Sequence, residues 1–338
     1  MTVEPSRPIA VRILGTGEYL PARQVTSDSF DRRWGKPAGW TQRHAGVAVR
    51  HYAGADEPAT LMGERAARAA LAAAHLQPSD MDCVISACSL MEQAIPCSAA
   101  LLHARLGLQG SGLTAFDVNA TCLSFVAALD LAACAIAAGR YRRVLIVSSE
   151  IASVGLNGED LDTAPLFGDG AAAVVLAADD GDSGSRLLAA HLETYSEGIE
   201  HCRVRAGGTR LRLEHGIDAL RAGSLFEMNG RATYRLAAAK LPGFLQRLLD
   251  KAGVELAQVQ RIVPHQASAK ALRHLQVALR LAPDTLVNVI GTRGNQMAAS
   301  IPGALHQAIS GGRIVRGDLI ALVGSGAGLA FGGAVLRY

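Results

Sequence analysis

Apolar and polar positions along the chain predict alternating helices and strands, and the order of these elements repeats. The Ala-rich residues 63–75 have helical spacing and precede the apolar strand CVISACS at residues 83–89. Residues 241–253 (LPGFLQRLLDKAG) also predict a helix, which leads through ELAQVQ into the strand RIVPHQAS. Both halves of the chain therefore contain a helix, a short connection and a buried strand in the same order.

Two further pairs of segments extend this repeat. Basic turns lead into buried strands near residues 145 and 320, with the sequences RYRRVLIVSSE and VRGDLIALVGSG. Gly-rich bends lead into apolar strands at residues 168–178 and 326–338. Three matched pairs in the same order indicate a duplicated α/β unit. Because continuous apolar strands need cover on both faces, each half is expected to be a mixed sheet between helices.

The most apolar helix is predicted to lie where the two halves pack together. Residues 122–139 (CLSFVAALDLAACAIAAG) offer almost no polar face to water, which is typical of a buried helix. Asp130 interrupts this stretch, and it is shorter than the roughly 20 apolar residues that span a bilayer. The Gly-, Ser- and Asp-rich residues 179–186 are the predicted boundary, giving halves 1–180 and 181–338, with a plain surface loop as an equal alternative.

Composition and charge exclude several classes of protein. The 338 residues include 33 Lys and Arg against 30 Asp and Glu, so no basic field indicates a nucleic-acid partner. The N-terminal MTVEPSRPIA lacks the positive cap and apolar run of a signal peptide. The 6 cysteines form no CxxC pair, which argues against a zinc site or a disulfide framework. We expect a cytoplasmic protein without nucleic-acid, membrane or metal partners.

Three residues have positions that suit chemistry. Cys122 follows a predicted strand and begins the apolar helix, where N-terminal amides are expected to lower the pKa of a thiol. His265 closes the strand RIVPHQAS, where the carboxyl end of a strand faces a crevice. Asn295 lies in a turn, where capping is the alternative role. The alternative for Cys122 is an inert buried thiol. The other cysteines are predicted to be inert buried thiols; they are Cys83, Cys88, Cys97, Cys134 and Cys202.

The motifs of the chain occur together in the order of a known family. The segments DVNATC, LFGDGAAA, VPHQAS, GNQMAASIP and GSGAG resemble the β-ketoacyl-acyl-carrier-protein synthase III family of the thiolase superfamily. The resemblance runs almost end to end, from RILGTGEYLPARQVTSDSF to LIALVGSGAGLAFGGAVLRY. It implies an α/β protein with a duplicated thiolase-like fold, in which two mixed-sheet halves are sandwiched by helices in αβαβα layers. It also implies a homodimeric acyltransferase.

The resemblance also implies a role for each candidate residue. Cys122 matches the nucleophile that accepts an acyl group from a thioester. His265 and Asn295 match the pair that stabilises the enolate of a malonyl extender as carbon dioxide leaves. The backbone N–H groups of Cys122 and Ala327 match the oxyanion hole. The implied reaction is a decarboxylative Claisen condensation without a cofactor, with thioesters of coenzyme A or of the phosphopantetheine of an acyl-carrier protein as substrates.

Departures from the family pattern concern the substrate. Ser268 stands where the family commonly has the Asn of HQAN, and Ala327 stands where a Gly is frequent. Trp40 matches the tryptophan that stacks on the adenine of coenzyme A. The arginines that usually accompany it fall on His44 and Leu161, which favours a carrier-protein thioester or a different acyl-CoA as donor.

Further polar and apolar positions carry weaker expectations. Ile95 matches a position that shapes the acyl pocket and is often aromatic, so its smaller side chain favours a primer longer than acetyl. Lys270 is expected at the mouth of a pantetheine tunnel, facing an acidic carrier protein, and a solvated surface is an equal alternative for it. A structural role is expected for Asp169, and no catalytic role for Glu150 or Glu197.

Two other functions remain open. The first is an acyltransferase that forms acyl-Cys122 but passes the acyl group to an alcohol or amine without decarboxylation. The presence of both His265 and Asn295 argues against it. The second is a non-catalytic partner subunit, which would be marked by loss of the nucleophile, whereas Cys122 is present.

Overall fold

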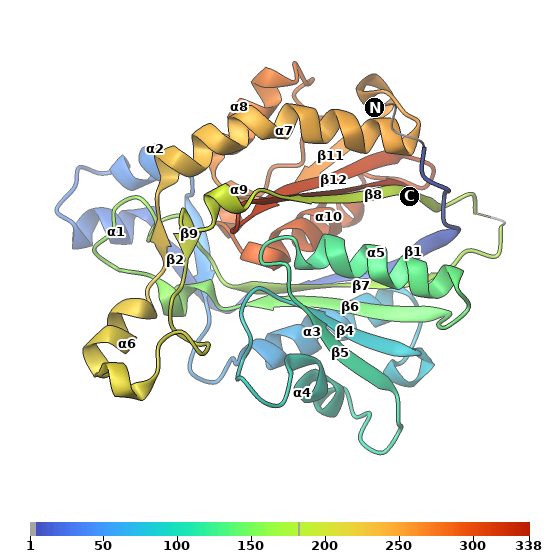
Figure 1. Cartoon of the computed structure of the whole chain (residues 1–338), viewed down its shortest axis with the longest axis horizontal. Coiled ribbons are helices and arrows are strands. Elements are labelled where there is room, and N and C mark those ends of the chain that lie inside the picture. The colour runs from blue at the N-terminus through green and yellow to red at the C-terminus, as the bar shows by residue number, and fades with distance from the viewer. Residues whose placement is uncertain (1–4, 182) are drawn as a thin grey trace.

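Two mixed β-sheets form the frame of the molecule (Figure 1). The computed structural model describes residues 5–181 and 183–338. The larger sheet has the order β1-β7-β6-β4-β5, and its strands in that order are Val11–Tyr19, Gly170–Ala178, Arg143–Glu150, Cys83–Ala87 and Thr114–Val118. The smaller sheet has the order β11-β12-β13-β8, and its strands are Arg261–Pro264, Leu319–Gly326, Ala330–Arg337 and Arg186–Thr194.

The strand order of the smaller sheet repeats that of the larger one. Strands β11, β12, β13 and β8 take the places of β4, β6, β7 and β1. The first pair in each set is parallel and the others are antiparallel. The three predicted segment pairs thus occupy equivalent positions in the two sheets, as expected of a duplicated unit. The division at residues 180 and 181 stays a prediction, although strands β7 and β8 end and begin on either side of it.

Helices cover both faces of each sheet, which gives the expected αβαβα layers (Figure 1). Helices α3 and α4 lie on the outer face of the larger sheet, α5 and α10 lie between the sheets, and α7 covers the smaller sheet with α8 beside it. Their bounds, in that order, are Ala59–Ala73, Ser98–Arg105, Ser124–Ala137, Ser300–Ser310, Gly230–Ala252 and Ala269–Ala278.

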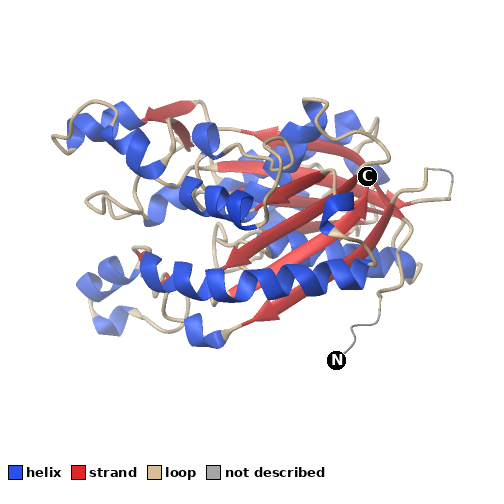
Figure 2. Cartoon of the chain, turned by 90° about the horizontal axis from the view of Figure 1, so that it is seen from above, coloured by secondary structure: helices blue, strands red, loops and turns tan. Residues whose placement is uncertain are grey.

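The remaining helices and strands are short. Helices α1, α2 and α6 gather at one end of the molecule, and the C-terminus lies toward the other (Figures 1 and 2). The short helices are Ser27–Arg33 (α1), Trp40–Ala45 (α2), Ile217–Gly223 (α6) and Ile290–Arg293 (α9). The short strands are Arg23–Thr26 (β2), Val49–Tyr52 (β3), Cys202–Arg203 (β9) and Glu227–Met228 (β10). In the chain apart from residues 1–4 and 182, no helix is long and apolar enough to cross a membrane.

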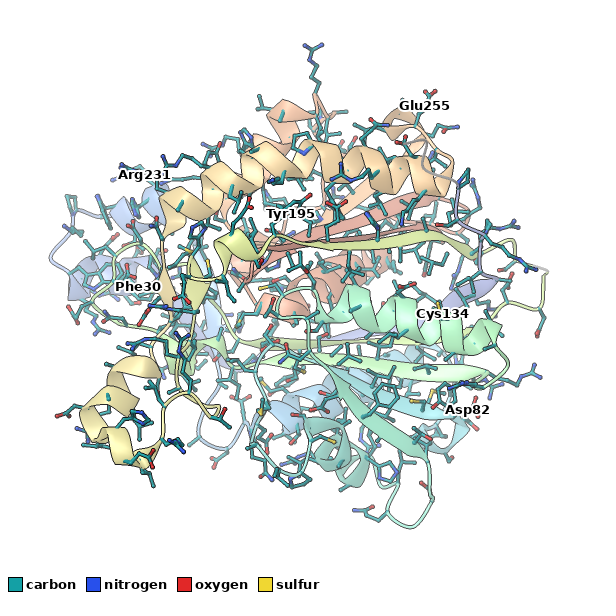
Figure 3. All side chains as sticks on the ribbon, viewed as in Figure 1. Phe30, Asp82, Cys134, Tyr195, Arg231 and Glu255 are labelled. Atoms are coloured by element: carbon teal, nitrogen blue, oxygen red, sulfur yellow. The ribbon has the colours of Figure 1, made fainter. Side chains whose placement is uncertain are left out.

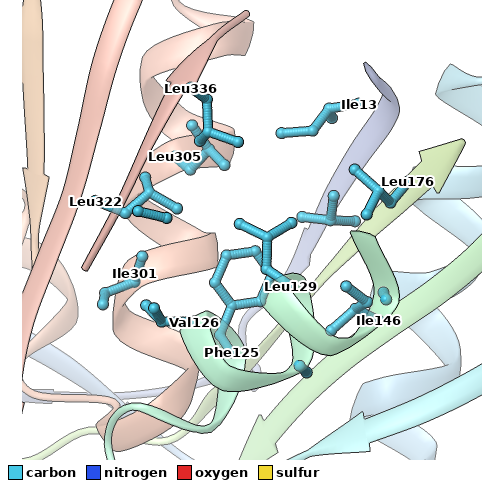
Figure 4. Packing of buried hydrophobic residues seen from close by; sticks show 14 of the residues in the cluster. Ile13, Phe125, Val126, Leu129, Ile146, Leu176, Ile301, Leu305, Leu322 and Leu336 are labelled. Atoms are coloured by element: carbon cyan, nitrogen blue, oxygen red, sulfur yellow. The ribbon is translucent and has the colours of Figure 1, made fainter. Parts of the chain in front are cut away.

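Helix α5 is buried in the core on one side and exposed on the other. Phe125 and Leu129 are fully buried against side chains of both sheets and of α10 (Figure 4). On the opposite side, Leu131 is 52% exposed and Cys134 is also exposed. The expectation that this helix is buried all round is therefore wrong. An apolar sequence shows that a helix avoids water, but it does not show which element covers each side.

Candidate active site

Cys122 lies in a tight turn between β5 and α5. Helix α5 begins at Ser124, slightly later than the sequence suggested, and Thr121 adopts a left-handed conformation with φ of 53°. The Ser124 hydroxyl donates to the carbonyl of Thr121 at 2.6 Å and accepts the N–H of Ala120 at 2.9 Å. These contacts hold Cys122 in place just before the first turn of α5.

The Cys122 sulfur faces two backbone N–H groups, its own and that of Ala327. Ala327 follows the end of β12, and this strand approaches the Cys122 turn closely because Gly326 has no side chain. A Cβ at Gly326 would lie 2.5 Å from the Thr121 hydroxyl. The structure thus brings both predicted oxyanion donors to the sulfur, where they can bind the oxygen of a tetrahedral intermediate.

The surroundings of Cys122 raise the pKa of its thiol to about 12. Burial is the largest cause, followed by the charge of Glu150 and the neighbouring Cys202, and the two N–H groups compensate only in part. The expectation that the helix start lowers this pKa is therefore wrong. Since the thiol is protonated at neutral pH, its attack on a thioester requires a base that accepts the proton.

His265 supplies a neutral imidazole next to the Cys122 segment. The side chain is enclosed, and burial lowers the pKa of His265 to about 4, so the ring is uncharged at neutral pH. A Cβ at Gly324 would lie 2.9 Å from His265 Cβ and 3.1 Å from Leu123 Cδ2. The histidine and the residue after Cys122 thus meet at the same point of β12. Within the described residues, His265 Nδ1 has no hydrogen-bond partner.

Asn295 is held in position by the LFGDG motif. Its N–H donates to the carbonyl of Leu166 at 2.8 Å, and its carbonyl accepts the N–H of Gly168 at 3.1 Å. The side-chain Oδ1 accepts the N–H of Met297 at 2.9 Å, which fixes Nδ2 as the donor end. Nδ2 donates to the carbonyl of Ala267 at 3.3 Å and retains a second hydrogen for a substrate oxygen. This contact links Asn295 to the loop that carries the histidine.

Glu150 is a buried carboxylate among these loops, and sequence reasoning gave it no role. It is 0% exposed and accepts the N–H groups of Ser89 and Leu90, and also that of Ala298. Ser89 in turn accepts the Asn119 amide through its carbonyl at 3.1 Å. Burial raises the pKa of Glu150 to about 7. The only sequence signal was a carboxylate that ends a continuous apolar strand.

Replacing Glu150 by Gln is expected to increase the reactivity of the Cys122 thiol. Gln retains one of the two acceptor oxygens, turns an NH2 group toward the other loop N–H, and removes the negative charge that disfavours the thiolate. The pKa of Cys122 should fall, and alkylation of Cys122 by iodoacetamide at pH 8 should accelerate about threefold to tenfold. The measurement is the rate of mass gain on the peptide that contains Cys122.

Glu197→Gln is the matched control for this variant. Glu197 is a largely exposed carboxylate that pairs with Lys240 at 3.5 Å. Its replacement should leave the alkylation rate of Cys122 unchanged. An equal rate in Glu150→Gln and wild type would show that the buried carboxylate does not control the thiol.

One face of the predicted adenine platform is covered from within the chain. Trp40 begins α2, and its ring stacks on the ring of His44 with centroids 4.7 Å apart and planes 9° apart. Lys36 Nζ lies 5.1 Å from the centre of the Trp40 ring, and His44 Nε2 lies 2.8 Å from Asp162. His44 thus covers one face of Trp40, in agreement with the weakened adenine site inferred from the missing arginines.

The other predicted substrate residues differ in their surroundings. Ser268 is the N-cap of α8, because its hydroxyl accepts the N–H of Ala271 at 3.1 Å. Lys270 is exposed in the first turn of the same helix. Ile95 is 86% exposed in the loop before α4, and the single chain does not place it in an enclosed acyl pocket. The roles of these residues toward substrate stay predictions.

Asp169 has the structural role expected of it. It is fully buried and accepts the N–H groups of Ala53 and Ser153 and the Ser153 hydroxyl at 2.6–2.8 Å. These donors come from neighbouring loops rather than from its own loop, which a single sequence could not show. In the described chain, no group of three His, Cys, Asp or Glu side chains has an arrangement that could hold a metal ion.

Comparison with known proteins assigns the family. Residues 116–196 match the family model of 3-oxoacyl-[acyl-carrier-protein] synthase III, and residues 249–338 match the model of its C-terminal part. The β-ketoacyl-[acyl-carrier-protein] synthase III of Acidiphilium cryptum is 36% identical over 325 residues, covering 96% of this chain and 98% of the relative. The chain belongs to the 3-oxoacyl-[acyl-carrier-protein] synthase III family.

Solved structures of synthase III enzymes share the fold over nearly the whole chain. The enzyme of Aquifex aeolicus superposes with a TM-score of 0.87 at 32% identity, covering 97% of this chain and 100% of that one. The enzyme of Pseudomonas aeruginosa gives 0.86 at 33% identity, covering 97% and 98%. The expected thiolase-like fold and the expected acyltransferase class are thereby confirmed, and the chain is a synthase III-like condensing enzyme.

Proposed function

We propose that this chain joins an acyl thioester to a malonyl thioester by decarboxylative Claisen condensation, through an acyl group on Cys122. The observation that supports the proposal is a neutral imidazole that meets the Cys122 segment at Gly324, since an oriented amide holds the loop of this histidine and the thiol faces two backbone N–H groups. The reaction passes through two kinds of oxyanion, and the site has a separate pair of donors for each.

In the first half-reaction, Cys122 attacks the thioester carbonyl. The neutral His265 accepts the thiol proton, which the leaving thiolate then takes up. The N–H groups of Cys122 and Ala327 bind the oxygen of the tetrahedral intermediate. The carbon–sulfur bond to the donor breaks, and the products are acyl-Cys122 and a free thiol.

In the second half-reaction, the malonyl thioester loses carbon dioxide. The electron pair of the broken carbon–carbon bond forms an enolate, whose oxygen accepts hydrogen bonds from His265 and Asn295. Uncharged donors suit this step, because a carboxylate at either position would repel the enolate in a site of low dielectric. The α-carbon then attacks acyl-Cys122, and the thiolate leaves and is protonated.

The substrates follow from this chemistry. The names of the relatives specify an acyl-carrier protein, and we extend this to the present chain as the carrier of the malonyl group. The stacking of His44 on Trp40 favours an acyl donor bound by its pantetheine arm rather than by an adenine sandwich.

No resident cofactor takes part in the proposed steps. The six free cysteines favour a cytoplasmic, reducing setting.

An acyl-enzyme experiment tests the proposed function. Protein incubated with acyl-CoA should gain the mass of one acyl group, and addition of malonyl-carrier protein should remove that mass and yield a β-ketoacyl-carrier protein. A protein that never gains the acyl mass would fit a non-catalytic partner subunit. Loss of the acyl group only to an added alcohol or amine would fit the acyltransferase alternative.

We further propose that the chain forms a homodimer through the β5 side of the larger sheet. Strand β5 is the last in its sheet, so one of its edges is unpaired within the described chain, and the exposed Cys134 of α5 lies on the same side (Figure 3). Leu131 of the same helix is also exposed. The loop before α4 adds the exposed Met91 and Ile95. An unpaired edge flanked by exposed apolar side chains is typical of an interface.

The Leu131→Asp variant tests this interface. A charge at the centre of an apolar interface is costly, so we expect the mass measured by light scattering to fall from dimer to monomer. Val277→Asp is the matched control, because Val277 is 70% exposed on α8, far from β5 in the layer order. A wild-type monomer, or a Leu131→Asp dimer, would contradict this interface.

A further inference from the structure

An apolar cavity lies between α7 and α8, which run side by side over the smaller sheet (Figure 1). Its space is about 800 Å³ when the open mouth is included. Six of the aliphatic side chains that form its walls are Ala237, Ala238, Leu241, Leu245, Leu272 and Leu275. Among the residues that the structure describes, no Lys, Arg, Asp or Glu lines it.

The inner end of the cavity reaches the proposed enolate site. His265 lines it, together with Ala267 and Ser325. The carbonyl of Ala267 is the one that accepts the Asn295 amide at 3.3 Å. Cys122 does not line the cavity. The cavity therefore begins at His265 and at the residue that holds the Asn295 amide, and not at the nucleophile.

Two polar side chains bridge the cavity at its rim. The Tyr234 hydroxyl and His274 Nδ1 are 3.0 Å apart, which joins α7 to α8, and the two rings meet edge to face with centroids 5.3 Å apart. Tyr234 is 46% exposed, so this bridge lies at the surface and not inside the cavity. Apart from His265 and Ser325 at its inner end, the described side chains inside the cavity are apolar, so it suits a hydrocarbon group better than a pantetheine arm or a phosphate.

We propose that this cavity is a subsite for an alkyl group on the extender, so that the enzyme accepts 2-alkylmalonyl thioesters. This inference rests on the proposed function, because it takes His265 and Asn295 as the residues that bind the extender thioester. The α-carbon of the extender is bonded directly to the carbonyl that these residues contact. A substituent on that carbon therefore starts at the inner end of the cavity, whereas a chain on Cys122 starts at a residue that does not line it.

With a 2-alkylmalonyl thioester, the same bonds break and form as in the malonyl reaction. The bond between the α-carbon and its carboxylate breaks, and the electron pair forms the enolate as carbon dioxide leaves. The α-carbon bonds to the acyl carbonyl, and the Cys122 thiolate leaves and takes a proton from solvent. The alkyl group is unchanged, so the product is a β-ketoacyl thioester with the alkyl group on its second carbon.

The test compares malonyl and hexylmalonyl thioesters on the same carrier, with the same acyl primer. Wild type should condense both, with kcat/KM values within about tenfold of each other. Ala238→Leu fills part of the cavity, and it should lower the ratio of hexylmalonyl to malonyl turnover about tenfold or more. Ala239→Leu on the exposed side of the same helix is the control, and it should leave the ratio unchanged. Ala271→Leu fills the cavity from α8 if the first variant does not fold.

The outcomes separate this inference from the proposed function. Wild type that condenses malonyl but not hexylmalonyl thioester would overturn the alkyl subsite and leave the proposed function intact. A change in the preference for primer length in Ala238→Leu, with an unchanged extender ratio, would also overturn the alkyl subsite, because the cavity would then hold the primer. Acylated enzyme that condenses neither extender would overturn the proposed function itself.

Discussion

The Cys122→Ala variant is expected to form no acyl-enzyme while keeping its native fold. Cys122 lies in the turn before α5, and the hydrogen bonds of that turn involve Thr121, Ser124 and Ala120 rather than the thiol. Ala therefore preserves the turn and removes only the nucleophile. Condensation should fall by about 10⁴-fold or more, because loss of a covalent nucleophile removes the whole two-step route. Intact-protein mass after incubation with acyl-CoA measures the first step, and circular dichroism measures the fold.

Cys88→Ala is the matched control for this variant. Cys88 is a second partly buried thiol close to Glu150, and burial raises its pKa to about 12, as for Cys122. Its replacement should leave acylation in place, because its sulfur lies toward Ser86 and Ser149. An acyl adduct on Cys122→Ala would show that Cys122 is not the nucleophile. The same conclusion would follow if Cys88→Ala were the only variant of the two that gained no acyl group.

Replacing His265 or Asn295 by Ala is expected to slow malonyl decarboxylation by about 10²–10³-fold, the usual effect of deleting one oxyanion donor. The two variants should differ in the first half-reaction. Because the Cys122 thiol has a pKa near 12, it depends on a base, so His265→Ala should also slow acylation. Asn295→Ala should acylate at nearly the wild-type rate.

The Asn295→Asp variant sharpens this comparison. Asp keeps the shape of Asn and can still accept the N–H of Met297, but it has no hydrogen to donate to an enolate. It should therefore decarboxylate as slowly as Asn295→Ala. Equal slowing of acylation and decarboxylation in both Asn295 variants would contradict a role confined to the extender.

Strand positions could be predicted from the sequence because their apolar runs are continuous. Strand β7 and its counterpart β13 both follow Gly-rich bends. Because both faces of these strands are buried, their sequences are continuous apolar runs. The duplication was visible for the same reason. The candidate residues Cys122, His265 and Asn295 were found through motif resemblance, and the structure adds the contacts that orient them.

The remaining features depend on contacts between distant segments. The raised pKa of Cys122 arises first from its burial and then from the charge of Glu150, which ends β6 and lies far from Cys122 in the sequence. The cavity beside His265 exists because small side chains of α7 and α8 face each other, and a single sequence does not show which faces meet. The helix-cap role of Ser268 could not be predicted, because it depends on where α8 begins.

The most direct test of decarboxylative condensation is a single turnover of isolated acyl-enzyme with malonyl-carrier protein labelled in its free carboxylate. Carbon dioxide and β-ketoacyl product should appear together, one of each for every acyl group lost from Cys122. Acyl groups that leave Cys122 for an alcohol or amine, with no labelled carbon dioxide released from any malonyl thioester, would contradict this account and identify the chain as a simple acyltransferase.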